Sequence, residues 1–248
     1  MLLGWGRAIL LQLAHPLIAA GVFDHSGFRA SPIAAAGRLR HTVRAMLGLT
    51  FGTEQERDQT LDGIRAIHRR VNGYLPETVG PWQAGTPYSA EDPALVLWVH
   101  ATLVESVLLA YETFVAPVAD AERDAYCDEA AWVAVALRAR PDDVPRTWES
   151  MRQYIADTHA SGVLSIGSQA RGLAKAVLSP AGAWPLAPAT WTNGLVTAGL
   201  LPPAMRAQYG LPWSPSRDRA FTTMVRALRL ARRGLPRAAA LWPQARAA

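Results

Sequence analysis

The chain has 248 residues, of which half are hydrophobic and 18% are charged, so one large domain with a sizeable core is expected. The formal net charge is +5, and every basic residue except Lys175 is an arginine. These arginines are scattered, which argues against a nucleic-acid partner, and the single cysteine, Cys127, excludes an internal disulfide and a thiolate zinc cluster. We therefore expect a cytoplasmic protein whose basic last helix is either solvated or in contact with a membrane surface.

The N-terminal segment, residues 2–14, is apolar with helical spacing, and His15-Pro16 is expected to end or kink it. Arg7 and Gln12 interrupt the apolar run, and no stretch of 18 residues is free of polar groups. No small-residue cleavage site follows a basic start. The segment is therefore predicted to be a buried helix rather than a membrane span or a signal peptide, with Gln12 and His15 in need of polar partners.

Helical patterns follow one another along the rest of the chain. Proline, glycine and capping residues mark where they begin and end, as at Ser31-Pro32 and Asn72-Gly73. The predicted helices cover 32–50, 54–74, 93–115, 119–138, a segment opened by Pro145, 188–201, 203–208 and 215–233, with Gly- and Pro-rich loops at 75–89 and 180–188. No segment alternates like a strand, and neither a Rossmann fingerprint nor a phosphate-binding loop is present. Residues 1–248 are thus predicted to form a single all-α domain.

His68 is the first candidate for chemistry. It continues an apolar stripe in which Leu61, Ile64, His68, Val71 and Leu75 recur at steps of three and four residues, so its side chain is expected to point inward. An inward histidine is most often a core residue with a hydrogen-bonded ring. A neutral imidazole in apolar surroundings is also what a metal or haem ligand requires.

Arg38, His41 and Thr42 form a second candidate group. Their spacing of i, i+3 and i+4 places them on one helical face, whereas Arg40 and Arg44 fall on another side and are expected to be solvated. A cation, an imidazole and a hydroxyl on one inward face are costly in a plain core and suit a site that holds an oxygen species or a propionate. The alternative is a surface face that leaves Arg38 and His41 in solvent.

His100 lies between Trp98 and Thr102 in an otherwise apolar stretch, so it is expected to be buried. It could serve as a second axial ligand, as a donor in a substrate pocket or as a core histidine, and we favour the last two roles. The string Asp24-His25-Ser26 is not a catalytic triad, because adjacent side chains diverge, and the nucleophile motif G-x-S-x-G is absent.

Five ordered blocks of the sequence resemble a known family. They are GRAILLQLAHPLIAAGVFDHSGFRASP, GRLRHT, FGT, HRRVNG and YSAEDPALVLWVHATL, and the resemblance covers roughly residues 4–160. The order and spacing of these blocks are similar to those of the DUF2236 family, the oxygenases related to latex-clearing protein (rubber oxygenase) and to MpaB.

The resemblance implies an all-helical, partly globin-like fold around a non-covalent haem b. It places the proximal iron ligand at His68 and the distal element at Arg38, His41 and Thr42. Rubber-cleaving members have a lysine where this chain has His41, so His41 could itself reach the iron. They also have a glutamate for proton abstraction that this chain lacks, and Asp24 is the nearest acid. Rubber-type cleavage is therefore less expected than oxidation in general.

Residues and resemblance together predict a haem b-dependent oxygenase or oxidase that uses dioxygen on a lipophilic substrate, with oxidative cleavage of a C=C bond as one outcome. Arg38, His41 and Thr42 are the expected catalytic residues; His68, Arg38 and His100 are expected to bind the cofactor, with His68 on the iron. Two alternatives remain: a haem-binding sensor or carrier without turnover, and a helical binding module without haem.

Overall fold

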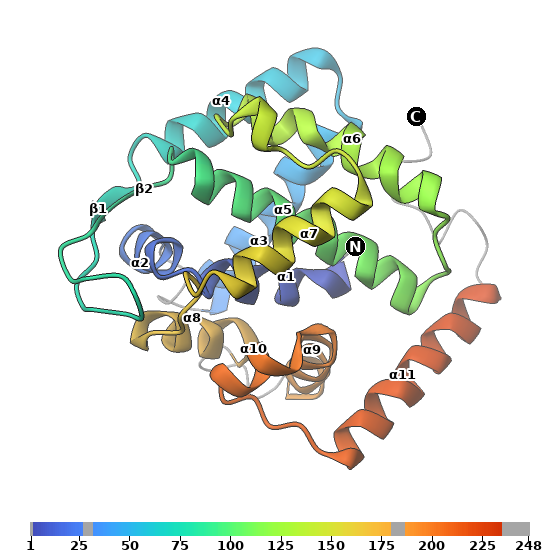
Figure 1. The fold of residues 1–248 in the computed structure, drawn as a ribbon. Helices are drawn as coiled ribbons and strands as arrows, with labels where there is room; N and C mark the ends of the chain where they lie inside the picture. Colours follow the sequence, from blue (N-terminus) through green and yellow to red (C-terminus); the bar gives the residue numbers. More distant parts are fainter. Residues whose placement is uncertain (1, 27–31, 180–186, 235–248) are drawn as a thin grey trace.

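The computed structural model describes residues 2–26, 32–179 and 187–234, and it is built almost entirely from α-helices (Figure 1). This confirms the predicted all-α class. In chain order the elements are η1 (Leu2–Gly4), α1 (Trp5–Leu13), α2 (Pro16–His25), α3 (Pro32–Phe51), α4 (Glu54–His68), β1 (Asn72–Tyr74), β2 (Pro87–Ser89), α5 (Pro93–Phe114), α6 (Asp120–Ala136), η3 (Pro141–Asp143), α7 (Trp148–Ala160), α8 (Ser168–Leu178), α9 (Ala187–Leu200), α10 (Pro203–Gln208) and α11 (Pro215–Arg233).

Helix α1 lies in the middle of the molecule and packs against α5, α8 and α9 (Figure 1). Leu10 and Leu11 are fully buried, which confirms the prediction of a buried N-terminal helix. Pro16 occupies the first turn of α2, and the chain bends by 107° between α1 and α2. The break arises because a proline has no backbone N–H to continue the ladder of α1.

Helix α5 is the long central element. Asp92 caps its N-terminus by accepting hydrogen bonds from the backbone N–H groups of Ala94 and Leu95. Trp98 is buried and donates a hydrogen bond of 3.1 Å from Nε1 to the carbonyl of Leu11, which fixes α5 against α1. In the described part of the chain, α5 is the one helix long and apolar enough to cross a membrane, and 61% of its most apolar stretch is buried inside the fold. That burial is the pattern of a core helix.

The chain after α4 differs from the sequence prediction. Helix α4 ends at His68 rather than at Tyr74, and Asn72–Tyr74 instead pairs antiparallel with Pro87–Ser89 in a small two-stranded sheet. The predicted extension of the helix was therefore wrong. The backbone N–H of Leu75 donates a hydrogen bond to the carbonyl of Thr86, and the N–H of Ala90 donates one to the carbonyl of Val71. These bonds join the two ends of the loop. The apolar periodicity of this segment predicted a longer helix, but strand pairing between Asn72–Tyr74 and Pro87–Ser89 is more favourable there.

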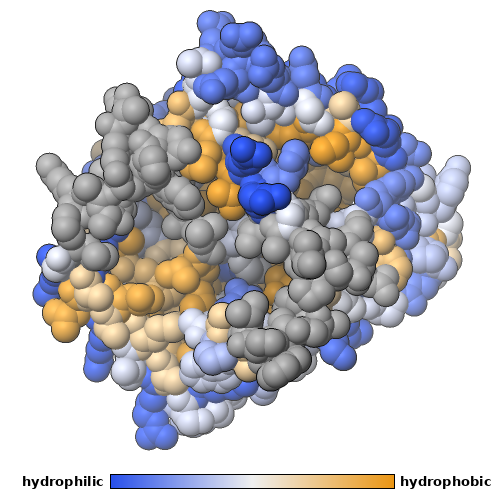
Figure 2. Space-filling model, turned by 180° about the vertical axis from the view of Figure 1, so that it is seen from behind, coloured by the Kyte–Doolittle hydropathy of each residue, from blue (hydrophilic) through white to orange (hydrophobic). Residues whose placement is uncertain are grey.

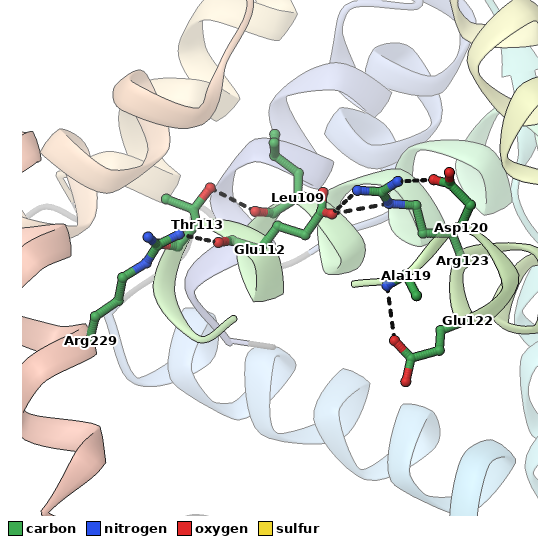
Figure 3. A network of polar contacts seen from close by, with 8 residues as sticks. All are labelled: Leu109, Glu112, Thr113, Ala119, Asp120, Glu122, Arg123 and Arg229. Carbon is green, nitrogen blue, oxygen red and sulfur yellow. Dashed lines mark hydrogen bonds and ion pairs between the residues drawn. The ribbon is translucent and has the colours of Figure 1, made fainter. Parts of the chain in front are cut away.

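The C-terminal helices α8 to α11 lie in the lower half of the molecule in the view of Figure 1. Helix α8 lies in a stretch of small residues for which no helix was predicted, while α10 and α11 have the predicted bounds. Helix α11 runs along the edge of the molecule and packs against α5 and α9 (Figure 1). Arg229 of α11 donates hydrogen bonds to the backbone carbonyls of Glu112 and Thr113 at the end of α5 (Figure 3).

Candidate functional site

A cavity of about 410 Å³ opens between α1, α3, α5 and α6. Most of its wall is apolar, and the polar groups that face it are few. The lining residues include Trp5, Ala8, Met46, Leu49, Phe51, Leu103, Val107, Tyr126, Ala130 and Trp132. Seen from behind, hydrophobic residues line hollows in the surface of the molecule (Figure 2). Volume and lining are those of a pocket for a small organic molecule.

His100 is the buried polar group of this cavity. Its side chain is 8% exposed, and its Nε2 atom has no hydrogen-bond partner in the part of the chain that the structure describes. Burial lowers the pKa of His100 to about 4, so the imidazole is neutral near pH 7. The predicted burial of His100 is confirmed. A buried nitrogen without a partner requires an explanation, and a ligand in the cavity supplies one.

The solvent side of the cavity carries charge. Arg57, at the start of α4, is exposed and lies over the ring of Trp132, with 5.9 Å between the guanidinium carbon and the ring centroid. Its Nη2 donates a hydrogen bond of 3.4 Å to the carbonyl of Thr50. Glu129 of α6 is also exposed and lines the cavity. A capping box between Thr53 and Glu56 stabilises the N-terminus of α4 immediately before Arg57. The backbone position of Arg57 is therefore well defined.

His68 is placed differently from His100. It is the last residue of α4, it is half-buried, and it is not among the residues that line the cavity. Burial lowers the pKa of His68, and the charge of Glu91 opposes that shift. Neither ring nitrogen of His68 has a hydrogen bond to any residue that the structure describes. The imidazole is therefore mostly neutral near pH 7, and it makes no hydrogen bond within the described part of the chain.

The predicted distal group lies in the first half of α3. The side chain of Arg38 is outside the described part of the structure, His41 is exposed, and Thr42 is half-buried. The structure therefore does not show His41 on an inward face. Arg40 and Arg44 are exposed, as expected. The same helix lines the cavity from Val43 onward, so the predicted distal residues lie immediately before the cavity wall in the chain.

The structure thus brings His100 into the cavity and leaves His68 and His41 outside it. Among the described residues, no group of three or more His, Cys, Asp or Glu side chains could hold a metal ion.

Two polar clusters were not found by sequence reasoning. Tyr88 donates a hydrogen bond of 2.6 Å to Asp24 and lies 3.4 Å from Nε2 of His25. Burial and this bond raise the pKa of Tyr88 above its ordinary value. In the second cluster, Arg7 of α1 forms an ion pair of 2.8 Å with Glu105 of α5. The partners in both clusters are far apart in sequence, so no local spacing announced them.

Comparison with known proteins matches nearly the whole chain to one family model. The family model described as "ER-bound oxygenase mpaB/B'/Rubber oxygenase, catalytic domain" matches residues 1–230. The chain is similar to an uncharacterized protein of Mycobacterium tuberculosis and to one of Mycobacterium bovis. Each is 28% identical over 238 residues, which covers 92% of this chain and 87% of the relative. No solved structure matches the chain significantly.

Proposed function

The chain belongs to the family of mpaB and rubber oxygenase catalytic domains, and from this premise we propose that it is a haem-dependent oxygenase acting on a lipophilic substrate. The observation that carries the proposal is the neutral imidazole of His100, which lines an apolar cavity of about 410 Å³ and whose buried Nε2 has no hydrogen-bond partner among the described residues. Such a cavity excludes water from an oxidation and holds an organic molecule by its apolar surface.

His68 is the ligand that we propose for the iron, because its ring is neutral and its nitrogens have no other partner among the described residues. Glu91 acts on His68 through its charge, which opposes the lowering of the pKa of His68 by burial. When bound, haem b supplies the redox chemistry with dioxygen, while the protein supplies position and polarity.

The remaining roles follow the polarity of the side chains. His100 would donate or accept one hydrogen bond at the inner end of the cavity and so orient the substrate. Arg38 and Thr42 would donate hydrogen bonds to dioxygen or to a haem carboxylate. His41, which is exposed, would hold or transfer a proton on the same helix. Oxidative cleavage of a C=C bond is one outcome of such a site, and simple oxidation is the other.

A haem-binding sensor or carrier is the second candidate. It would bind the same haem through His68 but would consume no oxygen in turnover. Oxygen uptake distinguishes the two candidates. An oxygenase consumes more oxygen when a lipophilic substrate is added, whereas a carrier does not.

A pair of variants tests the proposed assignment. His68→Ala is expected to abolish substrate-dependent oxygen uptake and haem retention together, whereas His100→Ala should retain haem and lose most of the substrate-dependent uptake. If His100→Ala loses haem and His68→Ala keeps it, the ligand is His100. If both variants keep haem and uptake, the proposed site is wrong. Exposed Arg70, replaced by alanine, is the control for general damage.

We also propose a peripheral contact with an anionic membrane surface through α11. Arg219, Arg226, Leu230 and Arg233 are exposed, and their spacing of i, i+7, i+11 and i+14 puts them on one face of this helix. Leu230 is 68% exposed on this face. Arginines around an exposed apolar side chain suit the boundary between lipid headgroups and acyl chains.

A further inference from the structure

The cavity has an exposed end and a buried end, and the two differ in charge. At the exposed end stand Arg57 and Glu129, with Trp132 37% exposed. At the buried end stand His100 and Ser106, which are 8% and 1% exposed. The buried end carries no formal charge, because the imidazole of His100 is neutral and the hydroxyl of Ser106 is uncharged. Formal charge on the cavity wall is thus confined to the mouth.

Arg57 is held at the mouth without an anion. Its guanidinium rests on the ring of Trp132 and bonds to the carbonyl of Thr50, both of which belong to the cavity wall. Within the described ranges of the chain it forms no ion pair, whereas other arginines such as Arg65, Arg123 and Arg146 do. A guanidinium that is already oriented loses little further conformational freedom when it binds a carboxylate.

We propose that the cavity takes an amphipathic anion, a molecule with an apolar chain and one carboxylate. The apolar chain lies against Met46, Leu103 and Val107 and ends near His100, and the carboxylate pairs with Arg57 at the mouth. This assignment names the substrate class of the oxygenase proposed above and rests on it. Glu129 opposes the carboxylate and sets how strongly the mouth favours an anion over a neutral head group.

The buried end of the cavity is lined mainly by apolar side chains, which suit the apolar chain of the ligand. Ala8 and Val104 also line the cavity and are buried, so the buried part of the ligand is surrounded largely by hydrocarbon with one neutral imidazole. A carboxylate placed at that end would lose its hydration and meet no cation to compensate, because the buried Arg7 is already paired with Glu105. The orientation with the carboxylate outward is therefore favoured.

The test compares a fluorescent polyene fatty acid, cis-parinaric acid, with its methyl ester on the full-length protein. The two probes have the same chain and differ in charge. We expect the acid to bind more tightly than the ester, and Arg57→Gln to weaken the acid roughly fivefold to tenfold while leaving the ester unchanged. Glu129→Gln should strengthen binding of the acid, and raised salt should weaken it, because the pair at the mouth is solvent-exposed.

Two controls locate the binding. Arg70→Gln removes an exposed arginine outside the cavity and should change neither affinity. Ala130→Phe fills the cavity and should weaken both probes, with its helical circular dichroism spectrum showing that it folds. Equal affinities for acid and ester, an equal loss in Arg57→Gln and Arg70→Gln, or binding that Ala130→Phe does not change would each overturn the inference.

The haem content of the same samples separates this inference from the proposed function. Selective binding of the acid by a protein that cannot bind haem would leave the anion site standing and refute the oxygenase. A haem-binding protein that oxidises the ester as readily as the acid, with no effect of Arg57→Gln, would leave the oxygenase standing and refute the anion site.

Discussion

Arg7 of α1 and Glu105 of α5 form an ion pair of 2.8 Å in the interior, with side chains only 4% and 17% exposed. Arg7 also donates hydrogen bonds of 2.7 Å to the hydroxyl of Ser106 and 2.9 Å to the carbonyl of Leu200. One guanidinium thereby joins α1, α5 and the end of α9. The hydrogen bond from Arg7 also fixes the hydroxyl of Ser106, a residue of α5 that lines the cavity.

Replacing Arg7 by methionine should be strongly destabilising. The substitution leaves Glu105 charged and nearly buried without its partner, a loss of about 3–5 kcal/mol in the free energy of unfolding. Urea denaturation followed by circular dichroism measures it. The double variant Arg7→Met/Glu105→Leu should recover much of the loss, and the exposed Arg40→Met is the control. A single-variant loss below about 1 kcal/mol would contradict the buried pair.

His15 should make the fold sensitive to mild acid. Its ring is 6% exposed and packs against Trp82 with 5.0 Å between ring centroids. Burial lowers the pKa of His15 from 6.5 to about 4, while Asp92 acts weakly in the opposite direction. The unfolded chain therefore binds a proton that the folded chain does not. The contribution of His15 to stability is complete above pH 6.5 and is lost as the pH falls toward 4.

His15→Phe keeps a ring beside Trp82 and removes this titration. The shift from 6.5 to about 4 corresponds to roughly 3 kcal/mol, so the variant should lose that much less stability than the native chain between pH 7 and 4. Urea midpoints across this range give the answer. Parallel curves for the two proteins would show that His15 is not buried in its neutral form.

Most of the helices could be predicted because their signals are local. Pro215 and Ser214 begin α11, and the amphipathic pattern continues to Arg233, so its bounds were found. Helix α8 was missed although Ala170, Leu173, Ala174 and Leu178 recur at helical spacing on its buried face, because the surrounding small residues obscured that pattern. The hairpin was missed because three-residue strands are too short to show alternation, and their pairing depends on Asn72 meeting Ser89, which lies 17 positions away in the chain.

The candidate site was predictable only in part. Apolar neighbours on both sides predicted that His100 is buried, and this is confirmed. The cavity beside it is assembled from α1, α3, α5 and α6, and no local pattern shows that Trp5, Met46 and Tyr126 meet. Arg57 was not recognised, because an arginine in the polar first turns of a helix has the same pattern whether or not it stands over Trp132.

Thr53 should contribute about 1 kcal/mol to stability by capping α4. Its hydroxyl accepts a hydrogen bond of 3.3 Å from the N–H of Glu56, and the Glu56 carboxylate accepts one of 2.8 Å from the N–H of Thr53. Thr53→Ala removes half of this box and should lower the thermal midpoint by a few degrees. Thr53→Ser should restore it. An unchanged midpoint in Thr53→Ala would show that the cap is not formed in solution.

The outward face of α11 should bind anionic vesicles. Co-sedimentation with vesicles that contain phosphatidylserine should retain the protein, and vesicles of phosphatidylcholine alone should not. Replacing Arg219, Arg226 and Arg233 by glutamine removes about 1 kcal/mol of attraction per arginine, or roughly a hundredfold in affinity for the three. A matched triple of exposed arginines, Arg70, Arg140 and Arg171, should have little effect. Equal losses in both triples would refute a specific membrane face.

The central claim, that this chain holds a haem through His68, is tested most directly by the absorption spectrum of the purified protein loaded with hemin. The account predicts a Soret band that shifts on reduction and again on addition of carbon monoxide, because a reduced haem held by His68 would bind the gas. The band should be absent or resemble free hemin in His68→Ala. A native protein that gives only the spectrum of free hemin, or a His68→Ala variant with an unaltered Soret band, would contradict it.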